Sequence, residues 1–120
     1  MTNIQAILKA DECKRNTIDA EVKCAWLTEV DQTIYHHILA THEGELPAFP
    51  QYALNEEKEL LAPSPYDALY VKYIIMKIDE ATQELAKYNR SAALFAEAYQ
   101  SYADWYNRTH MPMQRGELKV

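Results

Sequence analysis

The chain has 120 residues, enough for one domain with one hydrophobic core. Hydrophobic residues make up 48% and charged residues 25% of the sequence, a composition typical of a globular protein. Only two glycines are present, which argues against a hairpin-rich β protein and excludes the glycine-rich loops that bind phosphate. The net charge is −6, and no cluster of lysines and arginines marks a surface for nucleic acid. We therefore expect a single helical domain over residues 1–120, without specific nucleic-acid recognition.

The cysteines and the hydropathy pattern argue against a zinc site, a disulfide and a membrane anchor. Cys13 and Cys24 are separated by ten residues, a spacing that fits no zinc motif. No apolar run approaches the roughly 20 residues needed to cross a bilayer. The first residues lack the shape of a secretory signal, so we expect neither a disulfide nor a membrane anchor.

The N-terminal part of the sequence predicts two helices. We place the first over residues 3–13 and the second over residues 19–42, with Gly44 as a stop signal. Thr17 or Asp19 can cap the second helix. That helix carries one apolar stripe at helical periodicity, made of Val22, Trp26, Leu27, Val30, Ile34 and Ile38.

Residues 43–63 predict a long irregular connection. A connection of this length is uncommon in a compact domain and is usually functional or mobile. It nevertheless carries six large apolar residues: Leu46, Phe49, Tyr52, Leu54, Leu60 and Leu61. These residues either fold back onto the chain's own core or dock on a neighbouring subunit. Together with Val71 and Ile75, from the apolar start of the next helix, they are the candidate interface residues.

The C-terminal half predicts a helical hairpin. Ser64-Pro65-Tyr66-Asp67 indicates a helix start, because Ser can cap a helix and Pro suits its first position. One unbroken helix from there to the C-terminal region would be too long for a globule of this size. We therefore predict a turn at residues 88–91 between antiparallel helices over residues 65–88 and 91–109. Residues 111–120 are predicted to form a flexible tail.

The predicted fold is all-α, with the helical hairpin packed on the N-terminal helical unit and the long loop between them. The predicted core draws apolar and aromatic residues from the second, third and fourth helices: Trp26, Val30, Ile34, Ile38, Tyr70, Ile74, Leu94, Tyr102 and Trp105. The seam between the third and fourth helices is predicted to hold most of the tyrosines, namely Tyr70, Tyr73, Tyr88, Tyr99, Tyr102 and Tyr106.

No pattern in the sequence indicates catalysis. Helical zinc sites prefer histidines four residues apart, and His36, His37 and His42 do not have that spacing. We expect these histidines at the surface near the C-terminus of the second helix, where the helix dipole favours positive charge. No G-x-S-x-G motif occurs, and the carboxylates are expected on solvated faces. We therefore predict that the protein is not an enzyme and that it has no metal site and no cofactor.

Four strings in the sequence resemble one protein family. They are WLTEVD with IY (residues 26–31 and 34–35), THEG (41–44), LLAPSPYDALY (60–70) and YADWYNRTHMP (102–112). Together they resemble small proteins encoded in the structural gene cluster of tailed phages and prophages of Gram-positive bacteria. The resemblance spans roughly residues 4–112, and the loop at 45–58 is its least similar part. The strings carry no chemistry and point to no catalytic residue.

The resemblance implies a head–tail connector, also called a neck or adaptor protein. Such proteins are small and helical, and they assemble as a ring, typically dodecameric, beneath the portal of the DNA-filled capsid. The ring prolongs the DNA channel and offers a surface to the next neck protein or to the tail. The implied partners are copies of the same chain, the portal protein and a downstream neck or tail protein. The implied location is the neck of the virion, after synthesis in the host cytoplasm.

The acidic residues suggest a channel wall under this interpretation. Residues 1–62 hold 11 acidic and 5 basic side chains. An acidic wall would let DNA slide without binding it. The candidate lining residues are Glu56, Glu57, Glu59, Asp79, Glu80 and Glu84. Two other classes stay open: a different virion role, such as tail completion or a capsid accessory protein, and a small helical regulatory protein that binds a host target.

Overall fold

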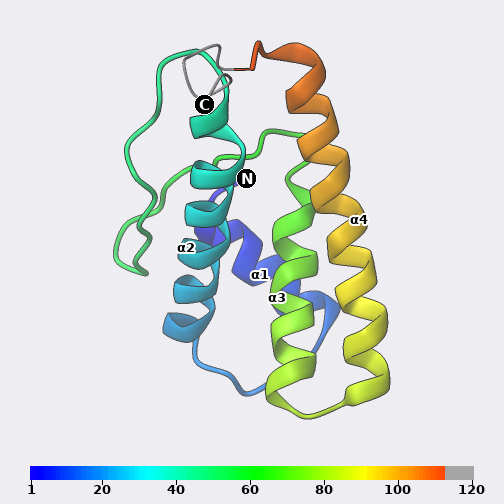
Figure 1. Ribbon diagram of the computed structural model, residues 1–120. Coiled ribbons are helices and arrows are strands. Elements are labelled where there is room, and N and C mark those ends of the chain that lie inside the picture. The colour runs from blue at the N-terminus through cyan, green and yellow to red at the C-terminus, as the bar shows by residue number, and fades with distance from the viewer. Residues whose placement is uncertain (113–120) are drawn as a thin grey trace.

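The computed structural model describes residues 1–112 and confirms the all-α class (Figure 1). Its four helices are α1 (Asn3–Cys13), α2 (Ala20–His37), α3 (Ala68–Ala81) and α4 (Leu85–Thr109). A 3₁₀ turn, η1 (Leu39–Thr41), follows α2. The described part of the chain contains three isolated β-bridges and no strand.

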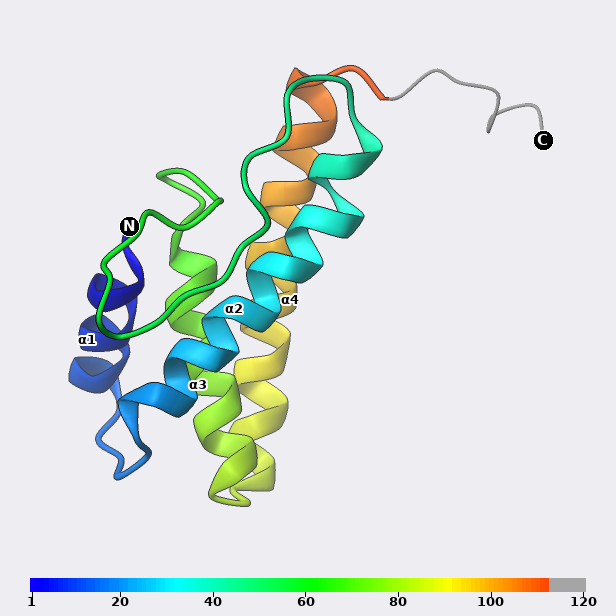
Figure 2. The ribbon, with the colours of Figure 1, turned by 90° about the vertical axis from the view of Figure 1, so that its left-hand side faces the viewer.

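Helix α3 lies at the centre of the molecule. It packs against α1, α2 and α4, and Figure 1 shows it between α2 and α4 with α1 behind. Figure 2 shows α1 on one side of the other three helices. Because α3 has neighbours on several sides, its large apolar residues are buried or half-buried. Leu69, Tyr70, Ile74 and Ile78 are all fully buried.

Helix α1 has the bounds that the apolar spacing predicts, and a capping box fixes its start. Gln5 N donates to Thr2 Oγ1 at 3.2 Å, and Thr2 N donates to Gln5 Oε1 at 2.9 Å. The two residues satisfy each other's free backbone amides, which stabilises the first turn of the helix.

Helix α2 ends earlier than predicted, at His37 rather than at residue 42. In a continuing helix the Ile38 carbonyl would accept from the backbone amide of His42. Instead, Thr41 Oγ1 donates to this carbonyl at 2.8 Å, and His42 Nδ1 lies 2.7 Å from it. Side chains therefore take the place of the backbone donor, and the chain tightens into η1.

The turn between α3 and α4 is at residues 82–84, so the predicted turn at 88–91 is wrong. Gln83 adopts a left-handed conformation with φ of 58°. Glu84 N donates to Asp79 O at 3.0 Å, and Gln83 N donates to Glu80 O at 3.2 Å. This is the Schellman arrangement that often ends helices, built here on glutamine instead of glycine. The sequence signal was missed because no glycine marks it.

The predicted helix start at residue 65 is also wrong, because α3 begins at Ala68. The Asp67 side chain makes no capping bond to the helix; its carboxylate lies 3.5 Å from the amino group of Met1. The preceding residues form a turn in which Tyr66 N donates to Pro63 O at 2.8 Å. Asp67 is thus held by a contact with the other end of the sequence, which a local pattern does not reveal.

The buried core contains most of the residues predicted for it. Trp26 and Trp105 are half-buried against it, whereas Leu94 is 45% exposed and is not a core residue. Helix α4 packs against only one other helix, α3. Fewer of its apolar residues are therefore buried than the sequence pattern suggested. The predicted core residues that are buried are Val30, Ile34, Ile38, Tyr70, Ile74 and Tyr102.

Candidate interaction surfaces

The buried carboxylate of Asp31 joins three segments of the chain. It sits in the middle of α2 and accepts hydrogen bonds from Tyr52 Oη at 2.5 Å, Tyr70 Oη at 2.6 Å and Leu61 N at 3.0 Å. Tyr70 Oη in turn accepts from Ala62 N at 2.7 Å. Each carboxylate oxygen therefore has a partner, which a fully buried charge requires.

The electrostatics of this cluster keep the tyrosines as donors. Burial raises the pKa of Asp31, and the three hydrogen bonds offset part of that shift. Burial and the nearby charge of Asp31 raise the pKa of both Tyr52 and Tyr70 far above the ordinary value. The cluster is closed to solvent, so its role is to fix the long loop onto α2 and α3.

The apolar loop residues were expected either to pack on the chain's own core or to dock on a neighbouring subunit. For two of them, the structure shows the first. Tyr52 and Leu60 are 9% and 5% exposed and belong to the protein's own core, so their assignment as interface candidates is wrong. Leu61 is half-buried beside them. Figure 2 shows the loop running back along α2 toward α1 before it reaches α3.

The other three apolar loop residues remain at the surface. Leu46, Phe49 and Leu54 are 43%, 50% and 39% exposed. Phe49 packs edge-on against Tyr35 of α2, with ring centroids 5.1 Å apart. Val71 and Ile75, the two candidates on α3, are half-buried.

His42 forms a second anchoring cluster and is not the surface histidine that the sequence predicts. It is buried, and its Nε2 lies 2.7 Å from Asn107 Oδ1 of α4. Its ring stands edge-on to Tyr106, with centroids 4.9 Å apart. Glu43 N also donates to Met111 O at 2.8 Å. These contacts connect the end of α2 to the end of α4. His36 and His37, by contrast, are exposed, as the sequence predicts.

The four strings behind the family resemblance meet in these two clusters. Asp31 belongs to the first string and Tyr70 to the third, and the two share a hydrogen bond. His42 belongs to the second string and Asn107 to the fourth, and they are also in hydrogen-bonding contact. The strings therefore contain residues that set how the helices are placed. Asp31 was not singled out from the sequence, although an acidic residue within the apolar stripe of a helix signals a buried charge.

The candidate lining residues fall into two groups, one near the turn from α3 to α4 and one on the loop. Asp79 is 3% exposed and pairs with Lys14, while Ser91 Oγ donates to it at 2.7 Å. It therefore lies in a buried ion pair and cannot line a channel. Glu84 contacts Lys14 and Lys87, and Glu80 contacts Lys77 at 3.3 Å. Most of the negative charge in this group is thus balanced by lysines.

Burial would by itself raise the pKa of Asp79. Hydrogen bonds from Lys14 and Ser91 outweigh burial and hold the pKa below its usual value. In the same pair, the hydrogen bond to Asp79 raises the pKa of Lys14. Both shifts favour the charged forms, so the folded protein stabilises this ion pair.

The loop carboxylates Glu56, Glu57 and Glu59 are exposed. The buried side chain of Asn3 positions this part of the loop: its amide donates to Ala53 O at 3.2 Å and accepts from Lys58 N at 2.9 Å. Three of the six predicted lining residues therefore form an ordered acidic surface on the loop, beside the start of α1.

An aromatic groove lies between α2 and α4, with α3 as its floor. Its volume is about 390 Å³. Phe95 packs against Tyr73 with ring centroids 4.9 Å apart and against Tyr99 at 5.8 Å. The sequence did not predict this groove: Tyr73 and Tyr99 were assigned to the seam between the third and fourth helices, and Val30 to the core. The groove is lined by Val30, Thr33, His37, Tyr73, Phe95 and Tyr99.

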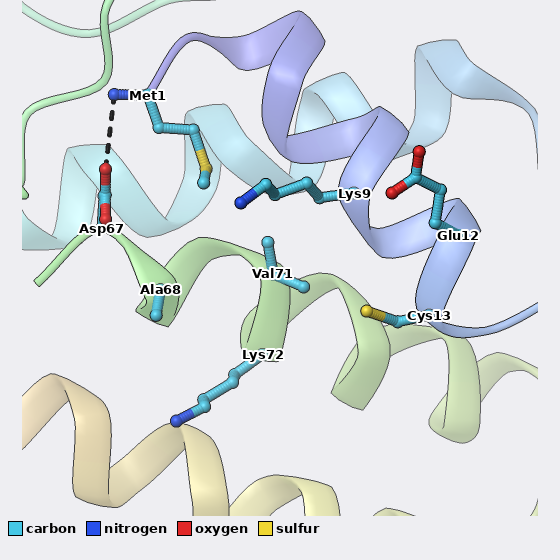
Figure 3. Close-up of a pocket in the computed structure, with 8 residues that line it drawn as sticks. All are labelled: Met1, Lys9, Glu12, Cys13, Asp67, Ala68, Val71 and Lys72. Atoms are coloured by element: carbon cyan, nitrogen blue, oxygen red, sulfur yellow. Dashed lines mark ion pairs between the residues drawn. The ribbon is translucent and has the colours of Figure 1, made fainter. Parts of the chain in front are cut away.

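A second hollow, of about 410 Å³, lies between α1 and α3 (Figure 3). Its residues are Met1, Lys9, Glu12, Cys13, Asp67, Ala68, Val71 and Lys72. We call it the α1–α3 pocket. Val71 of this pocket and Tyr73 of the aromatic groove are two residues apart on α3, which is a rotation of about 200°. The two concave surfaces therefore open on nearly opposite sides of α3.

Within residues 1–112, no three His, Cys, Asp or Glu side chains are placed so that they could share a metal ion. Cys13 is exposed, Cys24 is buried, and neither forms a disulfide. None of the helices in the described chain is long and apolar enough to cross a membrane.

Comparisons with protein-family models, with curated proteins and with solved structures gave no match. The candidate surfaces of this protein therefore rest on its own geometry.

Proposed function

We propose that the protein is a non-enzymatic structural component of a tailed-phage virion, a head–tail connector that forms a ring under the portal. The ring would extend the DNA channel and dock the next neck or tail protein. The proposal starts from the four strings at residues 26–35, 41–44, 60–70 and 102–112. The structural observation that carries it is the pair of unlike concave surfaces on opposite sides of α3.

A ring of identical subunits needs two different, complementary surfaces on each subunit, because every contact joins one face to another. The aromatic groove supplies an apolar face built by three helices. The α1–α3 pocket supplies a face of different chemistry, with lysines and carboxylates around an apolar floor. An isologous dimer would need only one self-complementary patch. Two hollows cannot fill each other, so each would receive a protruding segment of a neighbouring subunit or of a neck partner.

The anchoring clusters support the same function. A connector must hold its interfaces at a fixed angle for the ring to close. The Asp31 cluster fixes the loop against α2 and α3, and the His42 cluster fixes α2 against α4. The walls of the aromatic groove are thereby held in position.

The exposed carboxylates of the loop are the remaining candidates for the channel wall. Glu56, Glu57 and Glu59 are exposed on the loop beside α1. Glu56 lies 3.6 Å from Lys58 Nζ, Glu57 accepts from Thr2 Oγ1 at 2.6 Å, and Glu59 lies 3.1 Å from the amino group of Met1. An acidic lining repels the phosphate backbone and so disfavours arrest of the DNA. This part of the proposal predicts that the loop faces the axis of the ring.

The proposal is tested by deleting the gene in an inducible prophage that carries it and by electron microscopy of the lysate. We expect DNA-filled or leaking heads beside separate, complete tails. Aberrant tails or empty proheads would indicate that the protein acts elsewhere in the virion, not at the neck. Normal particles at normal yield would overturn the structural role and favour a regulatory protein.

Complementation of the same deletion tests the aromatic groove. Thr33 lines the groove and is exposed, so Thr33→Arg places a long charged side chain there at little cost to folding. We expect it to lower the phage titre at least tenfold. Thr17→Arg is the matched control, because Thr17 is exposed in the connection between α1 and α2 and outside the groove. Equal titres for the two variants would contradict a role for the groove in assembly.

A further inference from the structure

One ring nitrogen of the buried His42 has an acceptor as its partner. Nδ1 lies 2.7 Å from the carbonyl oxygen of Ile38, directly after α2. A carbonyl oxygen only accepts hydrogen bonds, so this contact requires a proton on Nδ1. Thr41 Oγ1 lies 3.0 Å from the same nitrogen, but its hydroxyl already donates to Ile38 O at 2.8 Å. Nδ1 therefore keeps its proton in both the neutral and the charged ring, and Nε2 is the nitrogen that gains or loses one.

The partner of Nε2 can serve either state of the ring. The side-chain amide of Asn107 on α4 places its Oδ1 2.7 Å from His42 Nε2. This orientation suits the charged ring, in which Nε2 donates. In the neutral ring Nε2 accepts, and a half-turn of the amide brings the donor Nδ2 to the same place. His42 is 6% exposed whereas Asn107 is exposed, so the amide connects a buried nitrogen to the surface.

No carboxylate fixes the charge of the His42 ring. Among the ion pairs within residues 1–112, none includes His42. From α4, the Tyr106 ring faces it with centroids 4.9 Å apart, and burial raises the pKa of that phenol, which keeps it neutral near pH 7.

The other groups around His42 leave the response to Asn107. His110 lies on Tyr106 with ring centroids 3.7 Å apart. Glu43 and Arg108, the sequence neighbours of His42 and Asn107, are exposed. The turn η1 and residues 111–112, which also contact this segment, contain no titratable side chain. The amide of Asn107 is therefore the polar group that must adapt when the ring changes its charge.

We propose that His42 and Asn107 form a pH-sensitive switch, in which protonation of the buried ring reverses the exposed amide. In the neutral state, Asn107 Nδ2 donates to His42 Nε2 and the amide oxygen faces outward. In the charged state, Nε2 donates to Oδ1 and the amide nitrogen faces outward. Ile38 O holds Nδ1 in both states, so the ring stays in place and the contact between α2 and α4 persists.

The switch changes what the end of α4 offers to a partner. The outward group of Asn107 is a hydrogen-bond donor in acid and an acceptor at higher pH. This inference stands independently of the connector proposal, since it concerns contacts within one chain and not the place of the protein in a particle.

The test is NMR spectroscopy of the full chain, labelled with ¹⁵N and ¹³C, between about pH 8 and pH 5, where histidine titrates. We expect neutral His42 to carry its proton on Nδ1, which the ¹⁵N shifts of the ring distinguish from a proton on Nε2. As the pH falls, the side-chain amide signals of Asn107 should shift with the same midpoint as the His42 ring. His110→Gln should leave this behaviour unchanged, which separates His42 from the other histidine at this end.

Asn107→Asp tests the role of the amide. Aspartate has only acceptor oxygens and a negative charge, so it favours the charged ring, and we expect the midpoint of His42 to rise by at least about one pH unit. The matched control, Asn89→Asp, adds the same charge at an exposed position 18 residues earlier on α4 and should leave the midpoint unchanged.

Four results would overturn the proposal. Neutral His42 with its proton on Nε2 would contradict the fixed role of Nδ1. An Asn107 amide that does not shift with the ring would contradict the coupling, and a ring that keeps one state across this pH range would contradict a switch. Equal midpoints in the two aspartate variants would contradict the part assigned to Asn107.

Discussion

Asp31 shows how one residue can connect parts of the chain that are far apart in sequence. Its carboxylate accepts from Tyr52 and Leu61 of the loop and from Tyr70 of α3. Hydrogen bonds to an ionised acceptor are stronger than neutral ones, and a buried donor left without a partner is costly. The long connection is therefore ordered, although its composition resembles that of a mobile loop.

Asp31→Asn tests this role. The variant loses the charge and turns one acceptor oxygen into a donor that faces a tyrosine hydroxyl. We expect it to lower the free energy of unfolding by about 2–4 kcal/mol, measured by urea denaturation. Glu97→Gln, at an exposed position of α4, is the control and should change stability by less than about 0.5 kcal/mol. A similar stability for both variants would contradict the anchoring role.

Asp79 gives a prediction of pH dependence. Its pKa in the folded protein lies below the value in the unfolded chain, so its contribution to stability is complete above the unfolded pKa and is lost as the pH falls through the folded pKa. Asp79→Asn should therefore cost about 1–3 kcal/mol near pH 7 and clearly less near pH 3. Urea denaturation of both proteins at the two pH values measures the difference. A cost that does not decrease in acid would show that the ion pair with Lys14 adds no stability.

The burial of single residues was predictable only where the helical pattern was unambiguous. Val30, Ile34 and Ile38 lie on the apolar stripe of α2 and are buried. Leu94 lies on the apolar face that the sequence predicts for α4, but it is exposed because only α3 packs against α4. The sequence pattern of one helix does not show how many other helices pack on it. The burial of Asp79 depends on Lys14, which is distant in sequence.

At the scale of elements, helix ends were harder to predict than helices. Helix α1 has its predicted bounds because its apolar spacing is local. The turn from α3 to α4 depends on a left-handed Gln83, a conformation for which glycine is the usual signal. The start of α3 depends on Asp67, whose carboxylate is held by Met1 from the other end of the sequence.

Gln83→Gly tests the account of this turn. Glycine adopts the left-handed conformation without the steric cost of a side chain, so we expect the variant to be about 0.5–1 kcal/mol more stable in thermal unfolding. The same change at Gln100, which is exposed within α4, should destabilise the protein by about 1 kcal/mol. Destabilisation by both substitutions would contradict the conformation of residue 83.

At the scale of the whole molecule, helix α3 divides two concave surfaces with different chemistry. The aromatic groove opens between α2 and α4, and the α1–α3 pocket, with its two lysines, opens on the other side. Neither could be predicted from the sequence, because each collects residues from elements whose packing is not encoded locally. Of the candidate interface residues named from the sequence, Val71 lines the pocket, and Leu46, Phe49 and Leu54 are exposed.

The connector proposal is tested most directly by cryo-electron microscopy of purified particles from a phage that carries this gene. The account predicts a ring of this four-helix fold between the portal and the tail, with the aromatic groove of each copy covered by its neighbour. It also predicts that Glu56, Glu57 and Glu59 face the channel. A ring with these carboxylates on its outer rim would contradict the channel assignment, and purified particles without this protein would contradict the proposed function.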